Sequence, residues 1–223
     1  MNKLPAYGRQ VLFILLVGFL FTGEASKAEA DRGKKKIQEV SSKKKARVEG
    51  FRSARFGMTE KEVFRAIYKD FRISKRNVER QVHPLEKTVN LGISGRDLLP
   101  QTGPAKAYYV FGYKSRRLIQ INIIWGKPVM AKPNAQEVVN LANQLRDHFS
   151  GKNFKQEGLV LNAPLGPEAI MVFRGSDETG RMVLLILDNP KNPVGPPNQD
   201  IVLKLSYIQR PGKADVFQVK KEK

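Results

Sequence analysis

The order of elements along the chain constrains the fold most, because one arrangement occurs twice. An amphipathic helix with a capped start is followed by short strands joined by tight turns, first from Thr59 and again from Asn134. Consecutive strands joined by hairpins pair antiparallel, and they bury one face against the helices. The sequence therefore predicts an α+β fold in which two helices pack on one face of antiparallel sheet. It leaves open whether the strands form one sheet or two.

The first helix is predicted from its start signal, "FGMT" followed by "EKEVFRAI". Thr59 can accept a backbone N–H as the N-cap, and Glu62 stands three residues later, which is the capping-box spacing. Met58 and Val63 are spaced to pack as a hydrophobic staple, and Gly57 permits a sharp turn into the helix. We therefore interpret "FGMT" as a helix start and not as a ligand-binding motif.

The second helix and most strands follow from similar signals. Asn134 is a cap candidate with Glu137 three residues on, and Gly151 marks the helix end. Ile121 and Ile123 alternate with polar residues, as in a strand with one buried face. Strands are predicted at residues 87–93, 107–113, 118–125, 154–161, 168–174, 181–188 and 201–208. Residues 73–85 form an added segment, and the proline-rich residues 189–200 form a surface loop.

Composition divides the chain into four parts. Residues 1–30 have a basic start and an apolar run too short to span a membrane comfortably, which predicts a secretory signal cleaved after Ala30. The basic residues that soon follow the run keep an uncleaved membrane anchor open as the alternative. Residues 31–50 are lysine-rich and predict a disordered basic linker. Residues 51–212 form the α+β domain, with candidate halves at 51–130 and 131–212, and residues 213–223 form a basic tail.

Charge is the main functional signal. Lys and Arg number 40 against 21 Asp and Glu, so the formal net charge is +19 at pH 7. A field of this size attracts anionic partners and weakens with salt. Nucleic acid is one such partner. For an exported chain the partners are envelope polyanions such as lipopolysaccharide phosphates, anionic lipid headgroups and acidic polymers. The competing interpretation is that the charge serves solubility alone.

The search for catalytic and metal-binding patterns gives no candidate residue. The chain has no cysteine, and its histidines, His83 and His148, are not spaced as a helical zinc pair. Ser94 lacks the spacing of a nucleophile elbow, and no phosphate-binding glycine loop is present. Asp177 and Glu178 provide too few oxygens for calcium and fit a hairpin turn. The sequence therefore predicts no catalytic, cofactor-binding or metal-binding residue, no cofactor, and a protein that is not an enzyme.

Basic residues near aromatic rings provide the candidate binding site. Guanidinium groups beside aromatics can hold phosphates or stacked rings. The candidate anion-binding or partner-binding residues are Arg72, Lys75, Arg76, Arg80, Lys114, Arg116 and Arg117. The aromatic residues near the second group are Tyr108, Tyr109, Tyr113 and Trp125. The alternative is that these aromatics belong to the core and that the basic residues form a solvated turn.

Two phrases together carry a family resemblance: "FRSARFGMTEKEVFRAI" and "DLLPQTGPAKAYYVFGYKSRRLIQINIIWG". They resemble a group of exported bacterial proteins with no assigned activity, over Phe51 to about Gly126. More distantly, the helix start and the "YYVFGYKSRRL" hairpin are similar to the small outer-membrane assembly lipoprotein and to the β-lactamase-inhibitor-like fold. That likeness implies a noncatalytic binding domain. The chain lacks the lipid-bearing cysteine, and no functional residue is carried over.

These observations together predict a periplasmic or secreted, noncatalytic protein that binds a partner in the cell envelope. The partner is an envelope protein or an anionic polymer or lipid, and basic charge adds to the attraction. No stable membrane span is expected after signal cleavage, and no nucleic-acid partner. The alternatives are a nucleic-acid-binding protein retained in the cytoplasm, and an enzyme whose site has no readable motif. Oligomeric state is left open.

Overall fold

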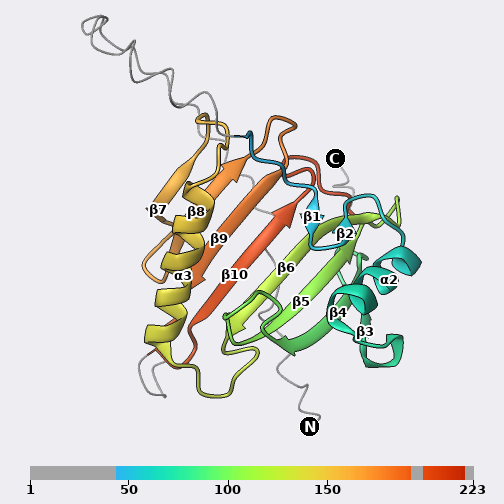
Figure 1. Ribbon diagram of the computed structural model, residues 1–223, viewed down its shortest axis with the longest axis horizontal. Coiled ribbons are helices and arrows are strands. Elements are labelled where there is room, and N and C mark those ends of the chain that lie inside the picture. The colour runs from blue at the N-terminus through green and yellow to red at the C-terminus, as the bar shows by residue number, and fades with distance from the viewer. Residues whose placement is uncertain (1–43, 192–197, 219–223) are drawn as a thin grey trace, which may run out of the picture.

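The computed structural model describes residues 44–191 and 198–218 (Figure 1). Within them, an eight-stranded antiparallel sheet has the strand order β3-β4-β5-β6-β10-β9-β8-β7, and β1 and β2 form a small second sheet. With helices α2 and α3, this is the predicted α+β architecture. The predicted strands, which the sequence could not assign to one sheet or two, all lie in the large sheet, and the small sheet consists of β1 and β2, which were not predicted.

The elements have the following bounds. The helices are α2 (Glu60–Phe71), the short 3-10 helix η1 (Lys75–Asn77) and α3 (Ala135–Ser150). The strands are β1 (Gly50–Phe51), β2 (Ala54–Arg55), β3 (Glu79–Val82), β4 (Val89–Arg96), β5 (Pro104–Phe111), β6 (Leu118–Gly126), β7 (Val160–Pro164), β8 (Ala169–Ser176), β9 (Met182–Asp188) and β10 (Val202–Ile208).

The large sheet is assembled from two units of similar order. In each, one longer helix is followed by four strands that pair with their neighbours in sequence, α2 with β3 to β6 and α3 with β7 to β10. The final strands of the two units pair with each other, so that Ile123 lies opposite Leu205 and Trp125 opposite Leu203. This one pairing joins the halves into a continuous sheet.

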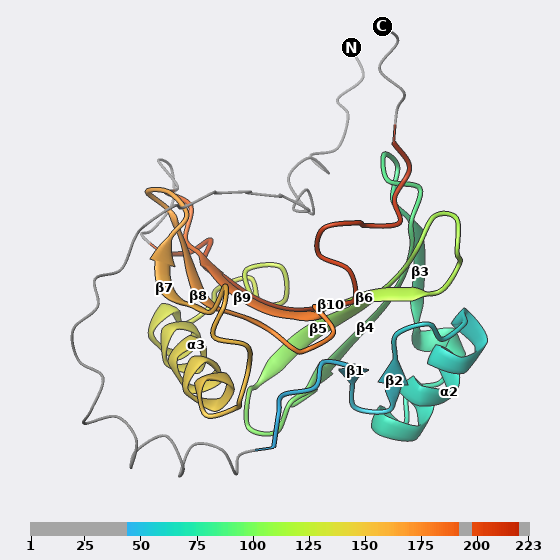
Figure 2. The same cartoon turned by 90° about the horizontal axis from the view of Figure 1, so that it is seen from above.

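Both helices cover the same face of the curved sheet, over its opposite ends (Figures 1 and 2). Val63, Ala66 and Ile67 are the buried residues of α2, and Phe149 is one of four in α3. They join alternate strand residues in a single core cluster. Burying a large apolar side chain stabilises a fold by about 1.5–3 kcal/mol, so this layer provides most of the cohesion of a chain without disulfides.

Polar side chains occupy the centre of the opposite sheet face. Tyr108, Asn122 and Ser206 are cross-strand neighbours on β5, β6 and β10, and such neighbours share a face. The Asn122 side-chain oxygen accepts hydrogen bonds from Gln120 Nε2 and Ser206 Oγ, both at 2.8 Å. Asn122 is buried, and these bonds satisfy its oxygen.

The folded region begins earlier than predicted. The linker was placed at residues 31–50, but Ala46 and Val48 are buried in the core cluster. The Ala46 N–H donates to the Asn153 carbonyl at 2.8 Å, and the Val48 N–H donates to Asp177 Oδ2 at 2.9 Å. The charged residues beside these small apolar residues, Lys45, Arg47 and Glu49, concealed a packed segment. Residues 1–43, which include the predicted signal and most of the linker, lie outside the described residues, as do 192–197 of the proline-rich loop and 219–223 of the basic tail.

Two strand predictions needed correction. The added segment at residues 73–85 contains η1 and strand β3, which pairs with β4 at one edge of the sheet. The strand predicted at residues 154–161 begins only at Val160. Phe154 instead packs in the core, with its ring 6.5 Å from Phe149 and 5.3 Å from Phe173.

Candidate functional site

The seven candidate basic residues lie on three neighbouring parts of the structure. Arg72 is the left-handed C-cap of α2, and Lys75 and Arg76 follow in η1. Arg80 lies in strand β3, and Lys114, Arg116 and Arg117 lie in the turn between β5 and β6. We call the turn, Gly112 to Arg117, the β5–β6 turn. Helix α2 connects the two groups that the sequence indicated.

Backbone hydrogen bonds join the segment just before α2 to Leu118, the first residue of β6, which directly follows the β5–β6 turn. The Gly57 N–H donates to the Leu118 carbonyl at 2.9 Å, and the Leu118 N–H donates to the Met58 carbonyl at 2.8 Å. The predicted capping box is present, because Thr59 accepts from the Glu62 N–H and Glu62 accepts from the Thr59 N–H. The "FGMT" segment therefore starts a helix and also places that helix beside the basic turn.

Several of the candidate cations already have a partner. Arg80 forms a two-point contact with Glu60, with Nε–Oε2 at 2.9 Å and Nη2–Oε1 at 3.2 Å. This hydrogen bonding raises the pKa of Arg80. Lys75 Nζ lies 5.1 Å from the centre of the Phe64 ring, and the Arg72 guanidinium lies 5.8 Å from that of Tyr68. Along α2, cations therefore lie beside rings of the protein itself, and these rings are not the aromatic residues that the sequence analysis considered.

The β5–β6 turn carries three of the candidate cations. Lys114, Arg116 and Arg117 are exposed, and none forms an ion pair with a described residue. Arg116 has φ 53° and lies 5.8 Å from the centre of the Tyr113 ring. Arg117 acts on Glu62, whose carboxyl pKa is lowered mainly by hydrogen bonds from Thr59 and slightly by this charge. Three cations on one short turn form a concentrated positive site.

The two ends of this surface act separately. Helix α2 has 12 residues, so it is about 18 Å long. Charges farther apart than about 8 Å are largely screened at physiological ionic strength. The β5–β6 turn is therefore one candidate site near the start of α2, where Arg80 pairs with Glu60, and Arg72, Lys75 and Arg76 are a second candidate site near the end of α2.

A C-terminal residue that sequence reasoning missed holds the basic turn. Asp215 accepts hydrogen bonds from the backbone N–H groups of Lys114 at 2.9 Å and Ser115 at 2.8 Å. Burial raises the pKa of the Asp215 carboxyl, but bonds from Ser115 and Lys114 outweigh it and lower the pKa below its usual value. This contact spans about a hundred residues, and no local pattern in the sequence predicts it.

Most of the aromatic residues considered for the site belong elsewhere. Tyr109 and Trp125 are core residues at 1% and 2% exposure, and burial raises the pKa of Tyr109. Tyr108 lies on the open sheet face beneath Lys106, whose Nζ is 2.8 Å from Glu79. Only Tyr113 accompanies the basic turn. Tyr109 and Trp125 are therefore core aromatics, as the simpler interpretation of the sequence held.

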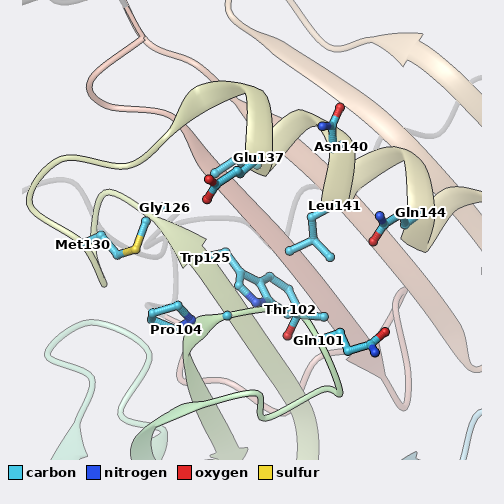
Figure 3. A pocket seen from close by; sticks show the side chains of 12 residues that line it. Gln101, Thr102, Pro104, Trp125, Gly126, Met130, Glu137, Asn140, Leu141 and Gln144 are labelled. Carbon is cyan, nitrogen blue, oxygen red and sulfur yellow. The ribbon is translucent and has the colours of Figure 1, made fainter.

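A pocket of about 350 Å³ lies between α3 and the loop before β5 (Figure 3). Its lining includes no Lys or Arg, and it has Trp125 and Leu141 with uncharged Asn140 and Gln144 from α3. Trp125 Nε1 is buried without a hydrogen-bond partner. The Glu137 carboxylate of α3 also lines the pocket. The lining therefore suits uncharged or cationic groups and not an anion, and the pocket is not part of the basic surface.

The histidines and acidic residues form no metal centre in the described chain. No group of three or more His, Asp or Glu side chains converges there. His83 Nδ1 accepts the Glu86 N–H at 3.1 Å in the turn after β3. His148 is near the end of α3, where burial and Lys152 lower its pKa. In residues 44–191 and 198–218, no helix has the length and apolar character needed to cross a membrane.

Comparison of the chain with protein-family models, with curated proteins and with solved structures found no match. The resemblance to exported bacterial proteins stays a prediction.

Proposed function

We propose that this protein is exported and acts without catalysis, binding an anionic partner in the cell envelope through the basic β5–β6 turn. The observation that carries the proposal is the cluster of three exposed cations, Lys114, Arg116 and Arg117, without ion-pair partners in the described chain. Surface cations that serve solubility alone do not require an ordered backbone. This turn is fixed by Asp215 at its tip and, through Leu118 directly after it, by the segment just before α2.

The ordered backbone of the turn favours a binding role because it lowers the entropy lost on binding. A long basic side chain loses rotamer entropy when it binds an anion, so a turn that is already ordered loses less backbone freedom on binding. Several cations at one site also act together on an extended anionic partner. The chain's net charge of +19 adds a long-range attraction. Both effects weaken as salt increases.

The proposal is tested by neutralising the turn. A variant with Lys114→Gln, Arg116→Gln and Arg117→Gln is compared with one carrying Lys132→Gln, Lys152→Gln and Lys155→Gln, which removes the same charge elsewhere. Binding to anionic vesicles and to a soluble acidic polymer is measured at low and high salt. We expect the first variant to lose about tenfold or more in affinity at low salt, and the control to lose much less.

The salt dependence decides between charge and other sources of affinity. Binding that does not change between low and high salt contradicts the proposal, and so do equal losses in the two variants. Stronger binding to duplex DNA than to any envelope polyanion favours the alternative of a nucleic-acid-binding protein.

A further inference from the structure

We propose that the anionic partner is the surface of a lipid bilayer, and that apolar side chains beside the basic turn enter it. This inference rests on the proposed function and assigns its partner. The surface consists of the β5–β6 turn, the turn between β3 and β4 (residues 83–88) and the C-terminal segment (residues 209–218). We call it the basic tip.

Hydrogen bonds and a ring contact hold the three segments of the basic tip together. The Tyr113 N–H donates to the Asp215 carbonyl at 2.8 Å, and the Phe217 N–H donates to the Glu86 carbonyl at 2.9 Å. The rings of Tyr113 and Phe217 meet edge to face at 5.4 Å. Residues 215–217 therefore bridge two turns that lie about thirty residues apart in the sequence. Figure 2 shows this segment beside the β3–β4 turn, on the side of the sheet away from α2 and α3.

Apolar side chains are unusually exposed at the basic tip. Leu85 is 69% exposed and Phe217 is 40% exposed. Val82, at the edge of the basic tip, is 53% exposed and lies on the sheet face that carries α2, because its cross-strand neighbour Val89 is in the core. These are three of the seven large hydrophobic residues that are exposed in the described chain, and Leu85 is the most exposed of all. Exposed apolar residues that gather at one place mark an interaction site. No described part of the chain covers these side chains.

The charges around these side chains favour an anionic surface. The three segments carry Lys87, Lys114, Arg116, Arg117, Arg210 and Lys213 against Glu86 and Asp215. The Asp215 carboxylate is engaged by the backbone of the β5–β6 turn. Glu86 acts on Lys204 of β10, where burial lowers the lysine pKa and Glu86 partly opposes that shift. The net balance of the basic tip is therefore strongly positive.

A bilayer surface matches both properties together. Amphipathic surfaces bind membranes when apolar side chains reach the boundary between headgroups and acyl chains while Lys and Arg contact anionic headgroups. A soluble polyanion or a nucleic-acid duplex can form ion pairs with the cations, but it has no apolar layer into which Leu85 and Val82 could insert. The combination of exposed leucine, valine and phenylalanine with cations on the same three segments therefore points to lipid.

The test uses the protein as purified from its cells, with vesicles of phosphatidylcholine alone or mixed with phosphatidylglycerol. The variant Val82→Ser with Leu85→Ser is compared with Leu161→Ser and Leu165→Ser, which removes two leucines, each 47% exposed, within and just after β7 at the far edge of the sheet. Co-sedimentation should show that the first variant binds the anionic vesicles about tenfold more weakly than wild type. The control variant should bind as wild type does.

A spectroscopic arm reports insertion directly. Because the chain has no cysteine, Leu85→Cys or Leu161→Cys can be labelled alone with a polarity-sensitive dye. We expect a blue shift on anionic vesicles for the label at position 85 and none at position 161. Wild-type binding by the Val82 and Leu85 variant, together with an unshifted label at position 85, overturns the inference.

The arms distinguish this inference from the proposed function. If neutralising Lys114, Arg116 and Arg117 abolishes vesicle binding while the apolar variant binds normally, charge-driven binding stands and insertion is wrong. If the protein binds the acidic polymer or DNA but no vesicle, the bilayer is the wrong partner. If neither variant differs from wild type, both proposals are wrong.

Discussion

At the scale of single residues, Asp177 explains how the lysine-rich N-terminal segment is held. Its Oδ1 accepts from Thr179 N at 2.9 Å, Thr179 Oγ1 at 2.7 Å and Arg181 N at 3.0 Å, and its Oδ2 accepts from Val48 N at 2.9 Å. The sequence correctly indicated that Asp177 belongs to a turn. It could not predict the bond to Val48, because 129 residues separate the two.

We expect Asp177→Asn to destabilise the protein by about 1–3 kcal/mol, because the amide NH2 group that replaces Oδ2 cannot accept the buried Val48 N–H. Chemical denaturation measures the loss. The neighbouring Glu178, which is exposed and pairs with Lys45 at 3.3 Å, provides the control, and Glu178→Gln should change stability by less than about 0.5 kcal/mol. Equal effects of the two substitutions would contradict this account.

The same carboxylate predicts a pH dependence. Burial raises the pKa of Asp177, but the hydrogen bonds from Thr179, Val48 and Arg181 outweigh it and lower the pKa below its ordinary value of 3.8. A lowered pKa means that its contribution to stability is complete above pH 3.8 and is lost as pH falls through the lower, folded value. Wild type should therefore lose more stability than Asp177→Asn on acidification below about pH 4.

At the scale of elements, the capped helices and the hairpins followed from local chemistry. Thr59 with Glu62, and Asn134 with Glu137, marked both helix starts correctly. Strand β3 was missed because all four of its residues are exposed, so no alternation of apolar and polar residues is present. Strand β7 was predicted to begin too early because the apolar Phe154 fits the pattern of a buried strand position. Phe154 is buried for another reason, since its ring packs against Phe149 and Phe173 before the strand begins.

The first cap can be tested alone. Thr59→Ala removes the acceptor for the Glu62 N–H and should destabilise the protein by about 1 kcal/mol. Thr59→Ser retains a hydroxyl and should cost much less. Thermal unfolding followed by circular dichroism compares the two. If alanine and serine behave alike, the capping box contributes nothing measurable.

The candidate site was predictable only as a set of residues. The grouping of Lys114, Arg116 and Arg117 on a turn followed from adjacency in the sequence. The involvement of Asp215, Glu86 and Phe217 did not, because contacts between distant segments leave no local signal. Sequence reasoning also could not determine that Arg80 is already paired with Glu60.

At the scale of the whole molecule, the pairing of β6 with β10 makes two repeated units into one sheet. Each unit has its own helix, but Leu203 and Leu205 of the second unit lie opposite Trp125 and Ile123 of the first, and all belong to one core cluster. Local patterns predicted the repeat. They could not predict this central pairing, because the local sequence of a strand does not determine which strand of the other unit it pairs with.

The shared core predicts cooperative unfolding. Trp125 is the only tryptophan in the chain and is 2% exposed in the first unit, so its fluorescence follows that unit. Circular dichroism follows both units. We expect the two probes to give coincident denaturation curves, as in a two-state transition. A fluorescence transition clearly separated from the dichroism transition would mean that the halves unfold independently.

One measurement on cells tests the central claim most directly: fractionation, a salt wash of the membrane fraction, and amino-terminal sequencing of the protein released. The account predicts a shortened chain beginning near Asp31, sedimenting with envelope membranes at low salt and largely released by about 1 M salt, where the Debye length falls to about 3 Å. An intact chain beginning at Met1 in the cytoplasm with nucleic acid, or membrane retention that ignores salt, would contradict it.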